Sequence, residues 1–170
     1  MNGLIQSKKQ LEKQAELKRQ QDLKDNYFMK LAIKKARLAL KNGEVPVGAV
    51  IVKDGVVIAV SENKKERKNC ALYHAEINAI IAASKKLGWR LDDCEMYVTL
   101  EPCAMCAGAI VSSRIKRVIF GAYEKKSGAF GSRFDFSSDS GLNHKLMVKG
   151  GVMEEECSEK LKTFFKTRRK

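Results

Sequence analysis

The spacing of apolar side chains divides the first part of the chain into two segments. From Tyr27 onward, apolar residues recur every three or four positions, which is the period of a helix with one buried face. Asn42-Gly43 then supplies a sequence typical of a helix end. Residues 1–24 alternate Lys, Gln and Glu with scattered Leu and lack a substantial apolar face. We therefore expect a basic arm over 1–24, either helical or disordered, and a single domain over 25–170.

Two runs rich in β-branched residues follow this helix. They span Val45–Val52 and Val56–Val60, and the segment Lys53-Asp54-Gly55 joins them. Because Asp-Gly accepts the positive φ values of a tight turn, the pattern predicts an antiparallel hairpin.

The next segments alternate between helical and strand patterns. Helical spacing over His74–Leu87 precedes a short apolar run at Met96–Leu100. Pro102 suits the first turn of a helix, which we expect to continue over Cys103–Val111. A strand at Arg117–Phe120 completes a strand–helix–strand crossover, in which the two strands pair in parallel.

The end of the chain completes the fold prediction. A long Gly- and Ser-rich loop follows, then a fifth strand at Lys145–Lys149 and a closing helix at Val152–Phe165. Long loops in compact domains are usually functional. Together these elements predict an α/β fold of three layers, α/β/α, in which a mixed five-stranded sheet has helices on both faces.

The composition changes this picture mainly through charge. The 170 residues include 33 Lys and Arg against 20 Asp and Glu, a formal net charge of +13. Proteins that neutralise phosphates need such an excess, but a basic excess also serves solubility, so charge alone leaves both interpretations open. The chain has no run of about 18 apolar residues and no apolar signal-peptide region at its N-terminus. We expect a cytoplasmic protein that does not bind a membrane.

Three residues have the pattern of a zinc site. His74 stands at one predicted helix start, and Cys103 and Cys106, three positions apart, share a face at another. Three protein ligands leave the fourth position of a tetrahedral zinc ion for water, as in catalytic sites. The five cysteines are an odd number, which argues against a disulfide framework.

Glu76 is the candidate acid and base beside that metal. The combination H-x-E with P-C-x-x-C is the signature of zinc nucleobase deaminases, in which the glutamate moves protons during attack by a metal-activated water. Residues two apart on a helix point about 200° apart, so His74 and Glu76 face one metal only if His74 lies at the first turn. The alternative is a structural zinc site closed by another cysteine or by His144, although a second paired ligand motif is lacking.

The chain resembles the bacterial tRNA-specific adenosine deaminases from about Tyr27 to Arg169. The segments that carry the resemblance are Gly43–Val50, His74–Glu76, Tyr97–Ala109 and Leu142–His144. The resemblance implies a cytidine deaminase-like fold, a homodimer whose active sites draw on both subunits, and inosine formation at the wobble position of a tRNA. It also implies one Zn²⁺ per subunit on His74, Cys103 and Cys106, with Glu76 as the proton shuttle at C6 of adenine.

The same resemblance implies a set of substrate and anticodon-loop contacts. They are Asn63, Ala75, Glu124, Phe165, Arg168 and Arg169. From the residues alone, Asn63 is equally well a turn residue at the end of the hairpin. Phe164 fits the core of an amphipathic helix, whereas Phe165 is the better candidate to stack on a base.

Two departures from the family pattern concern the pocket. Cys70–Tyr73 replaces the usual Asp-Pro-Thr-Ala, which changes the loop before His74, and Glu124 replaces the common Asp near the ribose. Two other functions stay open: a deaminase of a free base or nucleotide, guanine or cytosine, and a non-enzymatic zinc module that binds RNA.

Overall fold

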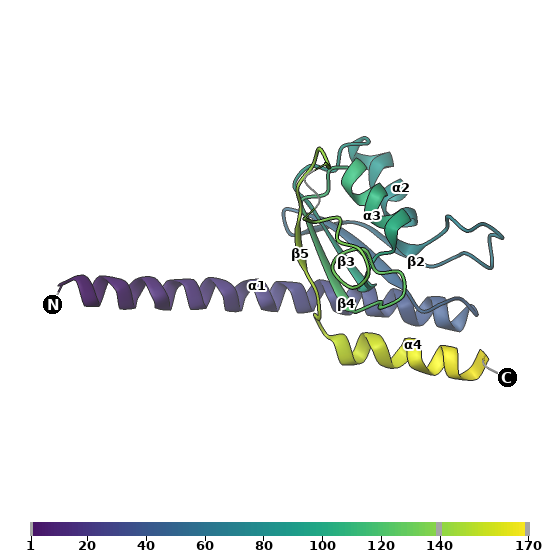
Figure 1. Cartoon of the computed structure of the whole chain (residues 1–170), viewed down its shortest axis with the longest axis horizontal. Helices are drawn as coiled ribbons and strands as arrows, with labels where there is room; N and C mark the ends of the chain where they lie inside the picture. Colours follow the sequence, from purple (N-terminus) through teal and green to yellow (C-terminus); the bar gives the residue numbers. More distant parts are fainter. Residues whose placement is uncertain (1, 139–140, 169–170) are drawn as a thin grey trace.

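The computed structural model describes residues 2–138 and 141–168 and has three layers (Figure 1). Its elements are α1 (Asn2–Lys41), β1 (Gly48–Lys53), β2 (Val56–Glu62), α2 (Ala75–Leu87), β3 (Cys94–Leu100), α3 (Ala104–Ser112), β4 (Arg117–Ala122), β5 (Met147–Lys149) and α4 (Glu154–Arg168). The sheet has the strand order β2-β1-β3-β4-β5. Helices α2 and α3 cover one face, and α1 and α4 cover the other, which confirms the predicted architecture.

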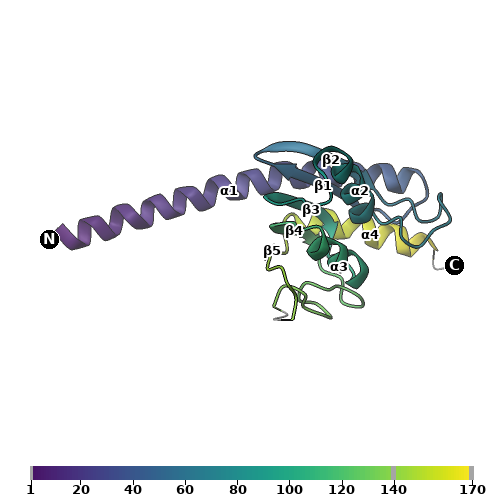
Figure 2. The same cartoon turned by 90° about the horizontal axis from the view of Figure 1, so that it is seen from above.

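Helix α1 is one continuous helix that includes the N-terminal arm. Its first half projects beyond the sheet, as Figures 1 and 2 show, and there Leu11, Leu17 and Leu23 are exposed. Of the two alternatives for the arm, the structure has the helical one. The buried face begins near Phe28 and Met29, where the apolar period begins in the sequence. None of the described helices carries an apolar stretch that could cross a bilayer.

The sheet combines an antiparallel and a parallel half. β1 pairs with β2 and with β3 in antiparallel fashion, and Asp54 (φ 49°) and Gly55 (φ 77°) form the turn of the predicted hairpin. β3 and β4 pair in parallel, as the crossover through α3 requires, and β4 and β5 also pair in parallel.

Several element boundaries differ from the sequence prediction. β1 begins at Gly48 rather than Val45, because Pro46 has no N–H with which to pair in a sheet. The strand passes close to α1 at Gly48, where a Cβ would lie 2.1 Å from the carbonyl oxygen of Ala32. Pro102 precedes α3 instead of lying in its first turn, because Cys103 has an extended conformation and caps the helix. The fifth strand is shorter than predicted and spans Met147–Lys149.

Asp25 ties α1 to three strands of the sheet. Its buried carboxylate accepts two hydrogen bonds from Arg117 (2.8 and 2.7 Å), one from Lys149 Nζ (2.7 Å) and one from the Tyr97 hydroxyl (3.2 Å). Burial alone raises the pKa of Asp25, but the hydrogen bonds from Arg117 and Lys149 outweigh it and lower the pKa to about 2. The protein therefore folds around an ionised Asp25.

This network predicts a loss of stability in acid. Because the folded pKa lies below the unfolded value, ionised Asp25 contributes about 2 kcal/mol above pH 4, and the contribution disappears as the pH falls from about 4 towards 2. Asp25→Asn should lower the free energy of unfolding by about 3 kcal/mol at pH 7 and flatten its decrease below pH 4. Urea unfolding across this pH range measures both effects. Asp22→Asn, at an exposed partner of Lys149, is the matched control, and equal stabilities of the two variants would contradict the assignment.

Candidate metal centre and substrate cavity

The three predicted metal ligands meet where helices α2 and α3 begin. His74 caps α2 in an extended conformation, Cys103 caps α3 in the same way, and Cys106 lies in the first turn of α3. His74 Nδ1 is 3.7 Å from Cys103 Sγ and 3.6 Å from Cys106 Sγ. The position of His74 is the one that the spacing of His74 and Glu76 requires, so both helix N-termini are directed at one point.

The donor set fits a tetrahedral zinc ion. Zn–S bonds of about 2.3 Å and Zn–N bonds of about 2.0–2.1 Å place N and S about 3.6 Å apart at the tetrahedral angle. The two N···S distances match this edge, and all three donor atoms lie within 4.8 Å of one another. Among the described residues, this is the one group of three or more His, Cys, Asp or Glu side chains with such spacing.

The sulfurs are prepared for a cation before one binds. A hydrogen bond from the Cys106 thiol, with a smaller contribution from His74, lowers the pKa of the Cys103 thiol to about 4. The hydrogen bond to Cys103 and burial raise the pKa of Cys106. Without a metal the pair therefore holds one negative charge, and metal binding releases the second proton.

The alternative of a closed structural zinc site lacks a fourth ligand in the described part of the chain. His144 lies in the loop before β5, where its Nε2 donates to the carbonyl oxygen of Ile115 (2.8 Å). Of the other three cysteines, Cys94 and Cys157 are buried and Cys70 is half-buried, and none belongs to the group of metal donors. The donor set in the described part of the chain is thus one histidine and two cysteines, and three protein ligands are the number typical of catalytic zinc sites.

Glu76 lies beside the metal donors in a closed environment. Only 4% of its surface is exposed, and it lines a cavity of about 150 Å³ together with His74 and Cys103. Burial raises the pKa of Glu76. A carboxyl group whose pKa is raised returns a proton less readily than a free one but accepts it more readily, which favours a group that first acts as a base.

The cavity also contains two of the predicted substrate contacts. Asn63, directly after β2, is buried and lines the cavity, and half-buried Glu124, after β4, lines it as well. Ala75 is fully buried in the core as the first residue of α2, and its side chain does not line the cavity. Any contact of Ala75 with a substrate would therefore involve its backbone.

Two buried glutamates that the sequence pattern does not single out hold the cavity walls. Glu44 accepts hydrogen bonds from Asn63 Nδ2 (3.2 Å) and from the backbone N–H groups of Glu66 (3.1 Å) and Arg67 (2.8 Å). It thus fixes the Asn63 amide and the loop after β2. The only signal in the sequence is a charged residue within the apolar segment Gly43–Val50.

Glu101 has the corresponding role on the other wall. Its carboxylate accepts from the backbone N–H groups of Glu124, Phe130 and Ser132, each at 3.0 Å, and from the Ser132 hydroxyl. The long loop after β4 is thereby folded over the cavity. Glu101 directly precedes Pro102, but its partners lie more than twenty residues away, so local patterns do not reveal them.

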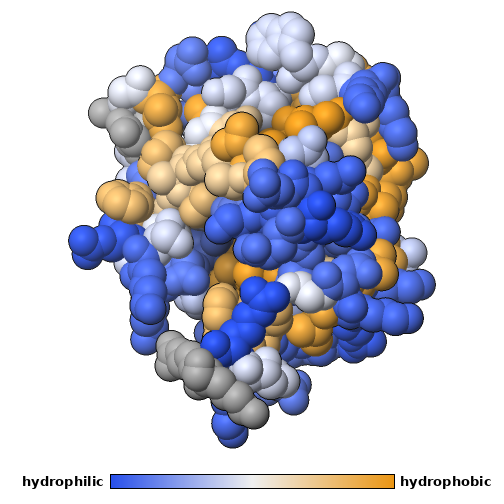
Figure 3. Space-filling view, turned by 90° about the vertical axis from the view of Figure 1, so that its right-hand side faces the viewer, coloured by the Kyte–Doolittle hydropathy of each residue, from blue (hydrophilic) through white to orange (hydrophobic). Residues whose placement is uncertain are grey.

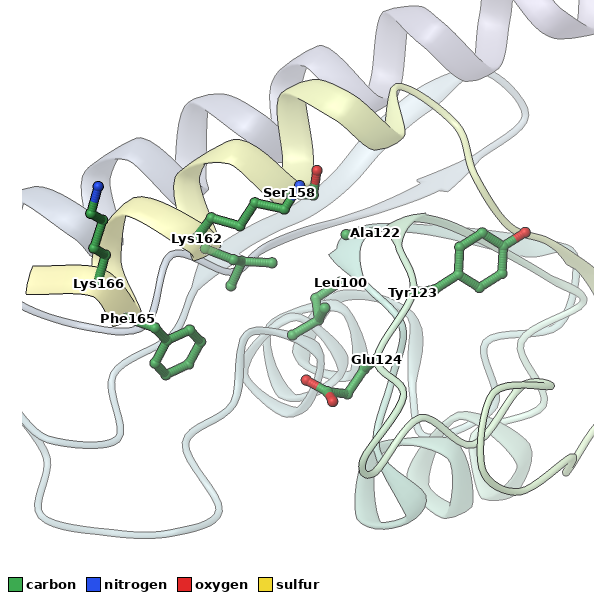
Figure 4. Close-up of a pocket in the computed structure, with 9 residues that line it drawn as sticks. Leu100, Ala122, Tyr123, Glu124, Ser158, Lys162, Phe165 and Lys166 are labelled. Atoms are coloured by element: carbon green, nitrogen blue, oxygen red, sulfur yellow. The ribbon is translucent and has the colours of Figure 1, made fainter. Parts of the chain in front are cut away.

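A second cavity of about 550 Å³ adjoins the first and shares Leu100 and Glu124 with it. Figure 4 shows Phe165 and Glu124 extending into it from opposite walls, whereas Lys166 points away. Phe165 is 46% exposed and Phe164 is buried, as the sequence analysis predicts.

Figure 3 shows the end of the molecule where α1 and α4 terminate, with hydrophilic residues across its centre and apolar patches around them.

Of the two C-terminal arginines that the sequence predicts as RNA contacts, Arg168 and Arg169, the structure describes Arg168. The Arg168 guanidinium lies 4.7 Å from the Phe164 ring centroid and donates to the carbonyl oxygen of Gly43 (2.7 Å). Arg168 therefore already holds the ends of α4 and α1 together. Arg169 lies outside the described residues.

Comparisons with known proteins agree with this geometry. Residues 23–169 match the model of the MafB19-like deaminase family. The chain is 46% identical over 147 residues to the tRNA-specific adenosine deaminase of Bacillus subtilis (strain 168), covering 86% of this chain and 91% of that protein. A solved structure from a study of tRNA:A34 deaminases superposes with a TM-score of 0.77 at 46% identity, over 79% of this chain and 99% of that one. A guanine deaminase from Bacillus subtilis gives a TM-score of 0.55 at 36% identity, over 67% and 84% of the two chains.

Proposed function

Because the chain belongs to the MafB19-like deaminases and, among them, to the tRNA-specific adenosine deaminases, we propose that it converts adenosine to inosine at the wobble position of a tRNA. The reaction is a hydrolysis: water adds to C6 of the adenine ring, the C6–N bond breaks, and ammonia leaves. The observation that carries the proposal is that buried Glu76 shares one small cavity with His74 and Cys103 of the metal centre.

Glu76 moves the protons in this reaction. As a carboxylate it takes a proton from the attacking water and passes it to the ring nitrogen next to C6. It then takes the second proton of that water from the new C6 hydroxyl and delivers it to the departing amino group, so that the C6 carbonyl forms as ammonia leaves. His74, Cys103 and Cys106 would hold a zinc ion, which supplies Lewis acidity that makes water a nucleophile near neutral pH.

The walls around Glu76 position the base and its ribose. Asn63, fixed by Glu44, offers an amide that both donates and accepts and suits an adenine edge. Glu124 lies where the catalytic cavity opens into the larger one, a position suited to the ribose hydroxyls. Phe165, in the wall of the larger cavity, provides a face on which a neighbouring base stacks. The excess of positive charge supports binding of the phosphates.

The same proposal includes a homodimer that acts in the cytoplasm, where its tRNA substrate is found. Three apolar side chains are exposed here: Leu72 and Tyr73 in the loop that leads to His74, and Ile81 on α2. A second copy on this face would cover them and contribute to the active site. Light scattering that gives the mass of a single chain would contradict the dimer.

The experiment that tests the function compares substrates. The purified, zinc-loaded protein should form inosine in an anticodon stem-loop RNA and should leave free adenosine, cytosine and guanine essentially unchanged. Phe165→Ala removes the exposed ring and should lower kcat/KM for the RNA about tenfold, because stacking contributes about 1–3 kcal/mol per base. Faster turnover of free guanine than of RNA, with no effect of Phe165→Ala, would instead support the free-base function that the guanine deaminase likeness suggests.

A further inference from the structure

The positive charge that lines the catalytic cavity comes from one lysine. Of the described residues that line this cavity, Lys65 is the only lysine or arginine. It belongs to the loop between β2 and α2, directly after Asn63 and Lys64, and its side chain is exposed at the rim. The adenine base that would enter the cavity is neutral, so it offers no negative charge for this lysine to bind.

The backbone around Lys65 is held rigidly. The N–H groups of the next two residues, Glu66 and Arg67, both donate to the buried Glu44 carboxylate, and the Lys65 carbonyl oxygen accepts from the N–H of Cys70 (3.1 Å). The N–H of Lys64 donates to the carbonyl oxygen of Tyr73 (2.9 Å). The Lys65 Cα is thus fixed at the rim, and only its long side chain is free to adjust.

The neighbouring cations are engaged within the protein, whereas Lys65 is available. Lys64 and Arg67 form ion pairs with Glu62 at 3.8 and 3.2 Å. Lys65 forms no ion pair with any described residue. Its exposed ammonium group at the rim of the cavity is therefore not held by a carboxylate in the described part of the chain.

We propose that Lys65 binds a phosphate flanking the adenosine whose base enters the cavity, and so selects a nucleotide within RNA over a free base. The inference rests on the proposed function and deepens it. The buried walls recognise the base, and the fixed cation at the rim recognises the one group that a free base lacks. An exposed ammonium–phosphate contact also releases a counterion, so it contributes to salt dependence.

The test removes the cation and the phosphate charge in turn. The substrates are an anticodon stem-loop RNA and two versions with a neutral methylphosphonate at the linkage 5′ or 3′ of the target adenosine. Lys65→Ala should lower kcat/KM for the unmodified RNA about fivefold to tenfold, mainly through KM, and reduce the slope of log(kcat/KM) against log[salt] by about one. One methylphosphonate should lower the wild-type value by a similar factor and leave that of Lys65→Ala unchanged.

Two controls make the outcome specific. Lys68→Ala removes an exposed cation of the same loop that does not line the cavity, and it should change kcat/KM less than twofold. Lys65→Arg should restore most of the activity. Two outcomes would overturn the proposal even if the wild type deaminates RNA. One is an equal loss of kcat/KM in Lys65→Ala and Lys68→Ala. The other is that each methylphosphonate lowers kcat/KM of Lys65→Ala by the same factor as that of the wild type. A wild type without activity on RNA would overturn the proposed function itself.

Discussion

Glu76→Gln will retain the metal and lose at least about 10³-fold in kcat for RNA deamination. The amide fills the same buried space, but it cannot take a proton from water or return one to the leaving group. General acid–base catalysis contributes about 10²–10⁴-fold, and Glu76 acts in more than one proton transfer. Because glutamine is neutral and close to glutamate in shape, the substitution adds no uncompensated charge to the buried site.

The measurement combines zinc content by mass spectrometry with single-turnover kinetics. Loss of activity together with loss of zinc would assign Glu76 to metal binding instead of proton transfer. A variant with full zinc content and more than a tenth of the wild-type rate would contradict its role as the proton shuttle.

Cys106→Ser will abolish stable zinc binding and, with it, essentially all activity. Cys106 is buried in the first turn of α3 and provides one of only two sulfur donors in the described group. A hydroxyl does not ionise at neutral pH, so the site loses the charge that offsets the cation. Because ligand thiols must lose their protons, zinc affinity of the unchanged protein should also fall as the pH is lowered.

Cys70→Ser is the matched control for that variant. Cys70 is a half-buried thiol in the loop before His74 and does not belong to the group of metal donors. The Cys70→Ser variant should keep one zinc ion per chain and deaminate RNA at the wild-type rate. Zinc retained at full stoichiometry by Cys106→Ser would show that the metal binds elsewhere.

The sequence predicted the elements whose side chains follow a regular period. β-Branched runs and the Asp54-Gly55 turn identified the hairpin, and the three-residue spacing of Cys103 and Cys106 with His74 identified the donors. Each of these signals is a short motif, although the motif of His74 and that of Cys103 and Cys106 lie about thirty residues apart and meet only in the fold. Boundaries were less predictable: the start of β1 depends on the close approach of Gly48 to α1, which no local pattern reveals.

The groups that shape the site were not predictable in the same way. Glu44 and Glu101 act through backbone N–H groups of distant loops, and an isolated glutamate in the sequence does not indicate such partners. Asp25 likewise joins Arg117 and Lys149 across more than ninety residues. The arm over residues 1–24 was ambiguous for another reason. It lacks an apolar face, so the spacing of its residues fits a solvated helix and a disordered segment equally well.

The most direct test of wobble deamination uses a complete tRNA pool that lacks inosine. The pool is incubated with the zinc-loaded protein or with Glu76→Gln and then sequenced, since inosine is read as guanosine. We expect an adenosine-to-guanosine change confined to the first anticodon position of one or a few tRNAs, present with the wild type and absent with the variant. Unchanged tRNA, from protein that carries one zinc ion per chain and deaminates a free base, would contradict it.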